Sequence, residues 1–216
     1  MTNTLASPAV RSVLDELHGA AARDDDRMPD LPTDRAFADI PAQERADALD
    51  GIVMPISAAA GSLLYLLVRA ARPATVVEFG TSFGISALYL AAGLADNGAG
   101  RLLTTELSAT KVAAARDNLA RAGLAERVTV LPGDALTTLA DVPGPVDLLL
   151  LDGWKDLYLP VLRLLEDRLP TGALVLADDT TMASMAEYLD YVRDPANGYA
   201  GVDFPVGDGV ELSCRV

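Results

Sequence analysis

The hydrophobic residues of this chain recur with one spacing before residue 73 and with another after it. From Ala74 onward, short apolar runs alternate with longer segments in which apolar residues recur every three or four positions. The short runs are typical of strands, and the longer segments are typical of amphipathic helices. Their alternation predicts right-handed βαβ units and a mostly parallel, doubly wound sheet. The predicted strands are 75–79, 101–106, 127–131, 146–152 and 173–177, and the predicted helices are 84–95, 108–122, 135–140, 158–168 and 182–192.

The first 72 residues show helical spacing and no strand pattern. Residues 8–22 predict one helix, because their apolar side chains fall on a single face: Val10, Val13, Leu14 and Leu17. Residues 23–32 are acidic, hold two prolines and predict a loop. Thr33 is placed to cap a helix that runs toward Leu49, and Ser57 is placed to cap the next helix, which stops before residue 73.

The end of the chain departs from the alternation of strands and helices. Residues 202–206 and 210–216 flank Gly207-Asp208-Gly209, a turn sequence that predicts an antiparallel hairpin. The chain has 216 residues, half of them hydrophobic, which suits one domain with a full-sized core. We therefore predict an α/β domain in which residues 1–72 form a helical cap that belongs to the same domain as the core, residues 73–216.

Composition excludes several classes of partner. The net charge is −14 and no basic stripe is visible, so we expect no nucleic-acid partner. Charge, Gly or Pro breaks every long apolar run, so we expect no membrane span, and the first residues lack the pattern of a secretory signal. Cys214 is the single cysteine, which fits a reducing compartment. We expect a cytoplasmic protein with a small-molecule partner.

A cofactor pocket is predicted at the ends of the first three strands. The first strand leads into a helix through Gly80 and Gly84, but their spacing is not the Gly-x-Gly-x-x-Gly that cradles a pyrophosphate. Glu106 ends the second strand, where an acid binds the hydroxyls of a ribose. Asp134 follows the third strand, placed to accept a hydrogen bond from an exocyclic amine. This order predicts an adenosine pocket that suits S-adenosylmethionine better than a nicotinamide cofactor.

Three carboxylates are predicted to converge beside that pocket. The apolar strand 146–152 ends in Asp152, and Asp178 and Asp179 follow the strand 173–177. These strands are neighbours in a doubly wound sheet, so their acids would repel one another unless a cation compensates. Oxygen ligands favour Mg²⁺, with Mn²⁺ or Ca²⁺ as alternatives. Lys155 is placed to take a proton from a hydroxyl of a bound aromatic vicinal diol.

The segment from Leu151 to Pro160, LDGWKDLYLP, closely resembles the catechol O-methyltransferase family. In that family the aspartate binds Mg²⁺ and the lysine is the base. Residues 177–179 are similar to the family's Ala-Asp-Asn, with Asp179 in place of the asparagine. The resemblance spans residues 50–216. It extends to the wider cation-dependent O-methyltransferases, including the caffeoyl-CoA type, in Asp134 and in the hairpin 205–209. It implies a Rossmann-like class I methyltransferase fold and a homodimer.

The resemblance also implies which residues contact the cofactor. Gly153 stands where the family has a histidine that contacts the cofactor, and Met54 lies at a family-like distance before Gly80. Trp154 matches a tryptophan that packs near the adenine. The implied cofactor-binding set is Met54, Glu78, Gly80, Ser82, Ser86, Glu106, Leu107, Asp134, Ala135, Asp152 and Trp154, beside the metal ligands Asp152, Asp178 and Asp179 and the catalytic Lys155.

The sequence thus predicts an enzyme that uses S-adenosylmethionine and a divalent cation to methylate a hydroxyl of a catechol-like molecule. Three alternatives stay open: a metal-independent methyltransferase of the same fold, a nicotinamide-dependent reductase, and a binding module without catalysis. Lys111 and Arg116, on the helix after Glu106, are predicted to be solvated, and Tyr158 to be a packing residue.

Overall fold

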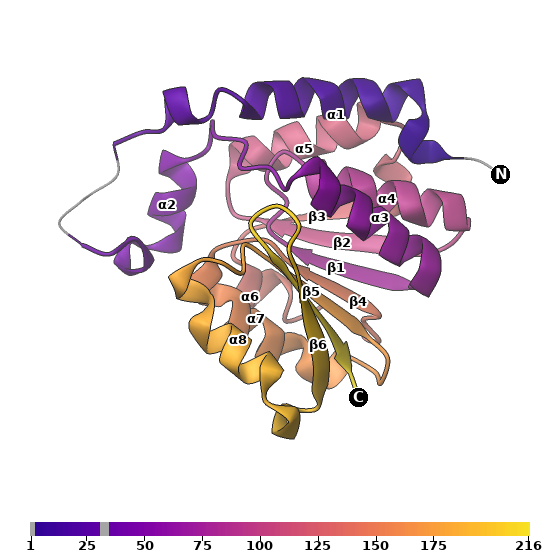
Figure 1. Cartoon of the computed structure of the whole chain (residues 1–216). Coiled ribbons are helices and arrows are strands. Elements are labelled where there is room, and N and C mark those ends of the chain that lie inside the picture. The colour runs from indigo at the N-terminus through magenta and orange to yellow at the C-terminus, as the bar shows by residue number, and fades with distance from the viewer. Residues whose placement is uncertain (1–2, 31–34) are drawn as a thin grey trace.

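The computed structural model describes residues 3–30 and 35–216, and its described part holds one seven-stranded sheet between two layers of helices (Figure 1). The strand order is β3-β2-β1-β4-β5-β7-β6. The first five of these strands are parallel, and β7 is antiparallel to both of its neighbours. The mostly parallel sheet with an antiparallel hairpin is therefore confirmed. The strands are β1 Thr75–Phe79, β2 Arg101–Glu106, β3 Val128–Pro132, β4 Leu148–Leu151, β5 Leu174–Asp178, β6 Tyr199–Phe204 and β7 Val210–Arg215.

The helices divide between the two faces of the sheet, except α2, which stands apart beyond the strand ends (Figure 1). On one side of the sheet lie α3 Ala58–Ala71, α4 Ile85–Asn97 and α5 Ala109–Arg121, with α1 Pro8–Ala21 packed on α4 and α5. The other face is covered by α6 Ala135–Thr138, α7 Tyr158–Leu165 and α8 Ala186–Arg193. The helix α2 spans Ala42–Ala48.

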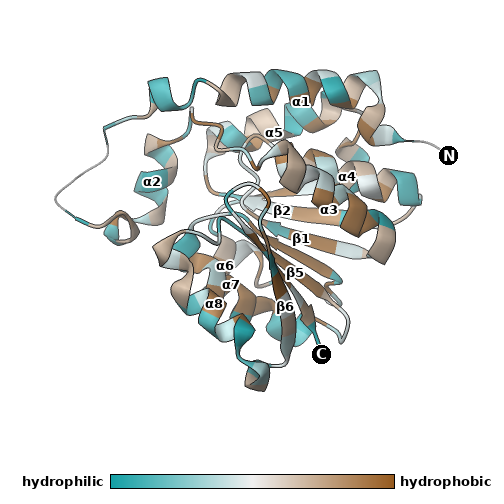
Figure 2. Cartoon of the chain, viewed as in Figure 1, coloured by the Kyte–Doolittle hydropathy of each residue, from teal (hydrophilic) through white to brown (hydrophobic). Residues whose placement is uncertain are grey.

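The core consists of one hydrophobic cluster on each side of the sheet. All four residues of β4 are buried, which explains why this strand is apolar without alternation. Figure 2 shows the same pattern as brown strands between helices that are teal on their outer sides. Burial of one large aliphatic side chain contributes about 1.5–3 kcal/mol to folding stability. Each cluster contains many such side chains, so together the clusters stabilise the sheet whose strand ends carry the site.

The predicted elements after residue 73 are present, with shifted ends. The strands β3 and β5 lie one residue later than predicted, and β6 begins at Tyr199, three residues early. The strand β4 is shorter at both ends than the predicted 146–152. The helix α8 begins four residues after the predicted start, because a 3₁₀ turn, Ala183–Met185, comes first.

One predicted helix before residue 73 is wrong. The expected cap Thr33 lies outside the described residues, and the stretch that was to run to Leu49 is a 3₁₀ turn, Phe37–Asp39, followed by α2. Pro41 causes the break, since it holds Ile40 in an extended conformation. The predicted loop 23–32 also contains a 3₁₀ turn, Asp25–Arg27. The predicted cap Ser57 is confirmed, because its side chain accepts a hydrogen bond from the Ala60 N–H.

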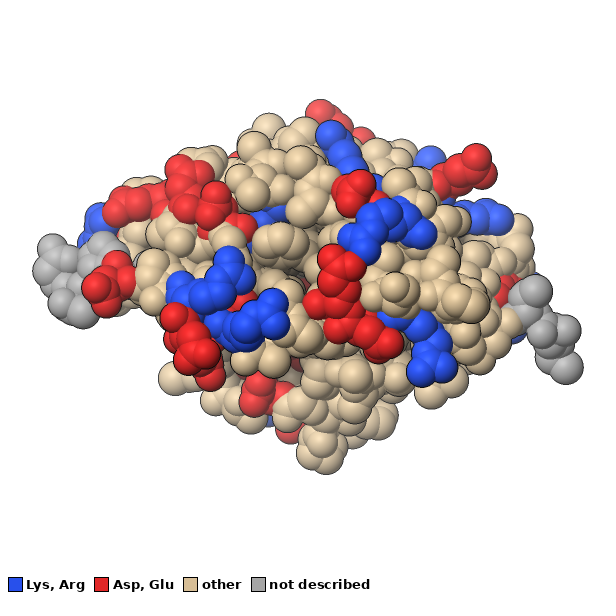
Figure 3. All heavy atoms as spheres, turned by 90° about the horizontal axis from the view of Figure 1, so that it is seen from above, with Lys and Arg blue, Asp and Glu red and all other residues tan. Residues whose placement is uncertain are grey.

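The surface carries mixed charge. On the face drawn in Figure 3, acidic and basic side chains lie among one another across the upper and middle part of the view. Within residues 3–30 and 35–216, no helix combines the length and the hydrophobicity that crossing a bilayer requires.

Candidate active site

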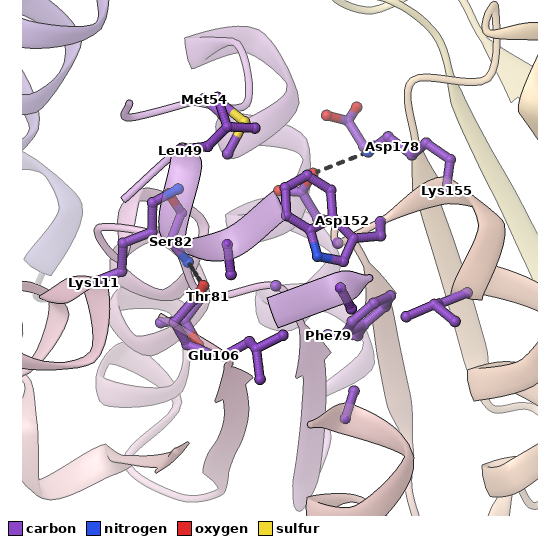
Figure 4. Close-up of a pocket in the computed structure, with 18 of the residues that line it drawn as sticks. Leu49, Met54, Phe79, Thr81, Ser82, Glu106, Lys111, Asp152, Lys155 and Asp178 are labelled. Atoms are coloured by element: carbon purple, nitrogen blue, oxygen red, sulfur yellow. Dashed lines mark hydrogen bonds and ion pairs between the residues drawn. The ribbon is translucent and has the colours of Figure 1, made fainter. Parts of the chain in front are cut away.

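A cavity of about 700 Å³ lies at the carboxyl ends of the parallel strands. Its floor comes from the turns after β1, β2, β3, β4 and β5, and its outer wall comes from α2 and the segment around Met54 (Figure 4). Every predicted site residue except Glu78 lines it: Met54, Gly80, Ser82, Ser86, Glu106, Leu107, Asp134, Ala135, Asp152, Trp154, Lys155, Asp178 and Asp179. The strand ends therefore bring together residues that the sequence spreads over more than a hundred positions.

The turn after β1 packs directly on the turn after β4. Gly80 has a φ of 103°, and a Cβ there would collide with the backbone of Asp152 and Gly153. Only glycine fits both conditions. The same turn also fixes Glu106, whose carboxylate accepts hydrogen bonds of 2.8 Å from the backbone N–H groups of Ser82 and Ser108. Glu106 is thus held at the cavity edge as a charged acceptor (Figure 4).

Glu78 lies in β1, beneath the cavity, and its side chain is fully buried. Among the described residues, neither carboxylate oxygen has a hydrogen-bond partner of normal geometry. Burial raises its pKa from 4.5 to about 7, while the nearby hydroxyls of Ser86 and Thr104 lower the pKa in part and the charge of Glu106 raises it. The structure therefore places this residue behind the cofactor turn, outside the cavity wall.

The acidic cluster consists of Asp152, Asp178 and Asp179. Each offers a carboxylate oxygen, and the three oxygens lie within 4.8 Å of one another. Burial raises the pKa of Asp152 well above its usual range and that of Asp178 to about 6, and the neighbouring carboxylates add to both shifts. Three converging oxygens with unfavourable mutual repulsion fit a hard divalent cation.

Lys155 faces the acidic cluster from the short 3₁₀ turn Lys155–Leu157. Its Nζ lies 2.9 Å from Oδ2 of Asp179 and 3.8 Å from Oδ1 of Asp152. It also donates a 2.7 Å hydrogen bond to the hydroxyl of Tyr158, whose ring is fully buried. Tyr158 was predicted to be a packing residue, and it packs, but its hydroxyl also holds the lysine. The sequence offered one signal for this contact, namely that Tyr158 follows Lys155 by three residues.

The departure from the family at Gly153 has a structural counterpart. A Cβ at residue 153 would collide with the ring of Phe79, with ring carbons 2.6 and 2.7 Å away. The Phe79 ring lines the cavity and fills the space into which a side chain at position 153 would project. Its edge-to-face contact with Tyr158, at 6.2 Å between ring centroids, fixes it there. Phe79 was not among the predicted site residues.

Lys111 corrects a second expectation, since it is buried and lines the cavity instead of being solvated. Burial lowers its pKa, and the charges of Glu106, Asp24 and Asp50 oppose that shift. Its ammonium lies 5.8 Å from the centre of the Phe83 ring, and no carboxylate oxygen of the described residues lies within ion-pair distance. Figure 4 shows it extending beside Ser82. Arg116 is exposed, as predicted.

Residues with strained, positive-φ backbone conformations cluster around the cavity. Four described non-glycine residues have positive φ, and three of them line the cavity: Met54 at 46°, Ser82 at 45° and Asp179 at 61°. Conformations of this kind cost free energy and persist where the surroundings impose them, often at functional sites. For Met54 the cause is visible, because Asp24, a buried carboxylate, accepts the N–H groups of both Val53 and Met54 at 3.0 Å.

Comparison with known proteins identifies the family. Residues 77–180 match the family described as "Methyltransferase domain". The catechol O-methyltransferase of Mycobacterium tuberculosis (strain ATCC 25618 / H37Rv) is 33% identical over 165 residues, which cover 71% of this chain and 74% of that protein. The chain belongs to the cation-dependent O-methyltransferase family, whose members of catechol and caffeoyl-CoA type use S-adenosylmethionine. All predicted site residues except Met54 fall within the matched residues 77–180.

Two further similarities extend the comparison. The catechol O-methyltransferase of Mus musculus is 34% identical over 147 residues, which cover 65% of this chain. The match covers 55% of the mouse protein, so the chain spans about half of that relative's length. The O-methyltransferase from Bacillus cereus, solved in complex with SAH, has a TM-score of 0.70 at 21% identity, and the alignment covers 95% of this chain and 91% of that one. The Rossmann-like methyltransferase fold is therefore shared.

Proposed function

We propose that this protein transfers the methyl group of S-adenosylmethionine to one hydroxyl of an aromatic vicinal diol, with the help of a divalent cation. The observation that carries the proposal is the arrangement of Lys155 beside three carboxylate oxygens that lie within 4.8 Å of one another. Membership of the cation-dependent O-methyltransferase family supports it.

In this proposal each group of residues has a separate task. Asp152, Asp178 and Asp179 would hold the cation, which supplies a lowered pKa to a hydroxyl that binds it. Lys155, in its neutral amine form, would accept a proton from the acceptor's hydroxyl at Nζ, while the Tyr158 hydroxyl keeps Nζ in place. Most of the acceleration would come from holding the two reactants in line in a water-poor site.

The cofactor side of the cavity fits an adenosine with a charged amino-acid tail. S-adenosylmethionine supplies the electrophilic methyl group when bound. Glu106, fixed by two backbone hydrogen bonds, would accept the hydroxyls of the ribose. Trp154 and Phe79 line the cavity and would offer aromatic surface to the adenine. Met54 would cover the bound cofactor from the outer side (Figure 4).

The charges around the cavity favour a small neutral acceptor over a coenzyme A thioester. Lys111 and Lys155 are the cations among the described lining residues. Lys155 pairs with Asp179, and the charges of Glu106, Asp24 and Asp50 act on Lys111 from beyond ion-pair distance. The outer wall is apolar, with Met28, Phe37 and Met182. A coenzyme A moiety carries several phosphates and would meet a protein with a net charge of −14. A catechol-like molecule carries no such penalty.

The direct test is methyl transfer to a panel of catechols and caffeoyl-CoA with Mg²⁺, with EDTA, and with two site variants. We expect transfer to catechols with Mg²⁺, and its loss in EDTA and in Asp178→Asn. Lys155→Met should lower kcat by about 10²–10⁴-fold, the usual contribution of a general base. The matched control is Arg11→Met, an exposed cation on α1, which should keep full activity. Full activity of Lys155→Met would overturn the assignment of the base.

One observation favours a second candidate, a metal-independent methyltransferase of the same fold. The ammonium of Lys155, at 2.9 Å from Asp179, by itself compensates one of the three negative charges. Transfer that survives both EDTA and Asp178→Asn would support this candidate. The homodimer and the cytoplasmic location also stay predictions. Light scattering of the purified protein tests the first.

A further inference from the structure

The segment 37–49 forms an outer wall of the cavity, although it belongs to neither helix layer. It contains the 3₁₀ turn Phe37–Asp39 and α2, and Phe37, Ala46 and Leu49 from it line the cavity. Figure 1 shows α2 beyond the strand ends, away from the helices that cover the sheet. Because the helix layers do not hold this segment, contacts with the turn after β4 have to keep it in place.

Arg45 of α2 makes that connection. Its side chain is 3% exposed, and its two terminal nitrogens donate to the two carboxylate oxygens of Asp156 at 2.7 and 3.0 Å, across 111 positions of sequence. The guanidinium also lies 5.1 Å from the Phe37 ring centre and 5.0 Å from that of Trp154. The two rings meet edge to face at 5.5 Å. Arg45 is thus enclosed by two aromatic rings and a carboxylate.

The partners of Arg45 are the two residues on either side of Lys155. Trp154 precedes the lysine and lines the cavity, and Asp156 follows it in the same 3₁₀ turn. A fixed Trp154 and a fixed Asp156 leave the backbone of Lys155 little freedom. The arrangement also has a cost, since the buried Nε of Arg45 has no partner among the described residues. The pair is half-buried, since the Asp156 side chain is 29% exposed. An ion pair with a buried partner adds little net stability compared with apolar packing, and its best-attested use is to fix one arrangement of the parts it joins.

We propose that Arg45 is a positioning residue that latches the segment 37–49 onto the turn 154–156 and so places Trp154 and Lys155 at the site. The methyl-transfer part of this inference rests on the proposed function. The latch itself does not, because it sets the environment of Trp154, which is the only tryptophan of the chain. Its emission reports the latch without any substrate.

The test compares Arg45→Met, Arg45→Lys and Asp156→Asn with the parent protein. The matched control is Glu44→Gln, which removes the exposed ion pair between Arg35 and Glu44 in the same segment. Three quantities are measured: the emission and acrylamide quenching of Trp154, the dissociation constant of SAH, and kcat and KM for a catechol with Mg²⁺. Arg45→Lys keeps the charge but loses the bidentate and stacked geometry.

We expect Arg45→Met and Asp156→Asn to shift the Trp154 emission to longer wavelength, to at least double its quenching constant, and to lower kcat at least tenfold. Arg45→Lys should lie between them and the parent, and Glu44→Gln should match the parent. The double variant Arg45→Met/Asp156→Asn should be no worse than the poorer single variant, because both break one contact. If Arg45→Met does not fold, Arg45→Lys and Asp156→Asn decide. Unchanged emission and kcat within twofold in these variants would overturn the latch. An absence of methyl transfer in the parent would overturn the proposed function and leave the emission test standing.

Discussion

Burial of the Glu78 carboxyl predicts a pH-dependent cost to folding that one substitution should remove. The native pKa is about 7, against 4.5 for an ordinary glutamate. Between these values the native state holds a proton that the unfolded chain has lost, so stability falls as the pH rises through this window. A shift of this size corresponds to about 3 kcal/mol once both states are ionised. Below pH 4.5 both states are protonated and the cost vanishes.

Glu78→Gln keeps the shape of the side chain and cannot ionise. The difference in unfolding free energy, variant minus parent, should therefore rise by about 2.5 kcal/mol between pH 5 and pH 8. Urea denaturation followed by Trp154 emission at several pH values measures it, and the difference removes the titration of other groups. Glu44→Gln, at an exposed site, is the control and should give a flat difference. Parallel curves for Glu78→Gln and the parent would refute the assignment of a buried carboxyl with a raised pKa.

Three further substitutions test separate parts of the site. Gly153→Ala should lower the unfolding free energy by about 1–3 kcal/mol in denaturation experiments, because the new Cβ meets the Phe79 ring. The double variant Gly153→Ala/Phe79→Leu should recover most of the lost unfolding free energy. Lys111 is a buried cation in the cavity wall, so we expect it to pair with the carboxylate of the cofactor's amino-acid tail. Lys111→Met should therefore weaken SAH binding by about 10- to 100-fold, the usual contribution of one charge-assisted hydrogen bond. Binding of 5′-methylthioadenosine, which lacks that carboxylate, should be unchanged in calorimetry. Tyr158→Phe should lower kcat about tenfold with little change in KM, since it removes the oxygen that holds Lys155, and equal kcat values would show that the hydroxyl is dispensable.

The strands and the acidic cluster were predictable from sequence because each depends on local pattern. An apolar run that ends in an acid marks a buried strand and its carboxyl end, so the placement of Asp152 and Asp178 follows from the run alone. The ends of β1 and β2 agree with the prediction for the same reason. Ser57 is predictable because a cap depends on three neighbouring residues.

The residues that the sequence did not reveal depend on contacts between distant segments. Lys111 has the spacing of a solvated helix residue, but it is buried, and two of the three carboxylates whose charges act on it, those of Asp24 and Asp50, belong to distant parts of the chain. The pair of Arg45 and Asp156 joins positions 111 residues apart, and neither neighbourhood signals the other. Pro41 was visible in the sequence, but the helix predicted from the cap candidate Thr33 toward Leu49 ran through it.

The central claim is that Asp152, Asp178 and Asp179 clamp a divalent cation beside Lys155. Diffraction from crystals grown with Mn²⁺ and SAH, collected at the manganese absorption edge, tests it directly. The account predicts one anomalous peak in the cavity, within about 2.0–2.5 Å of an oxygen of each of the three carboxylates, and its loss in Asp178→Asn. A cavity with bound SAH and no anomalous peak at saturating Mn²⁺ would contradict it.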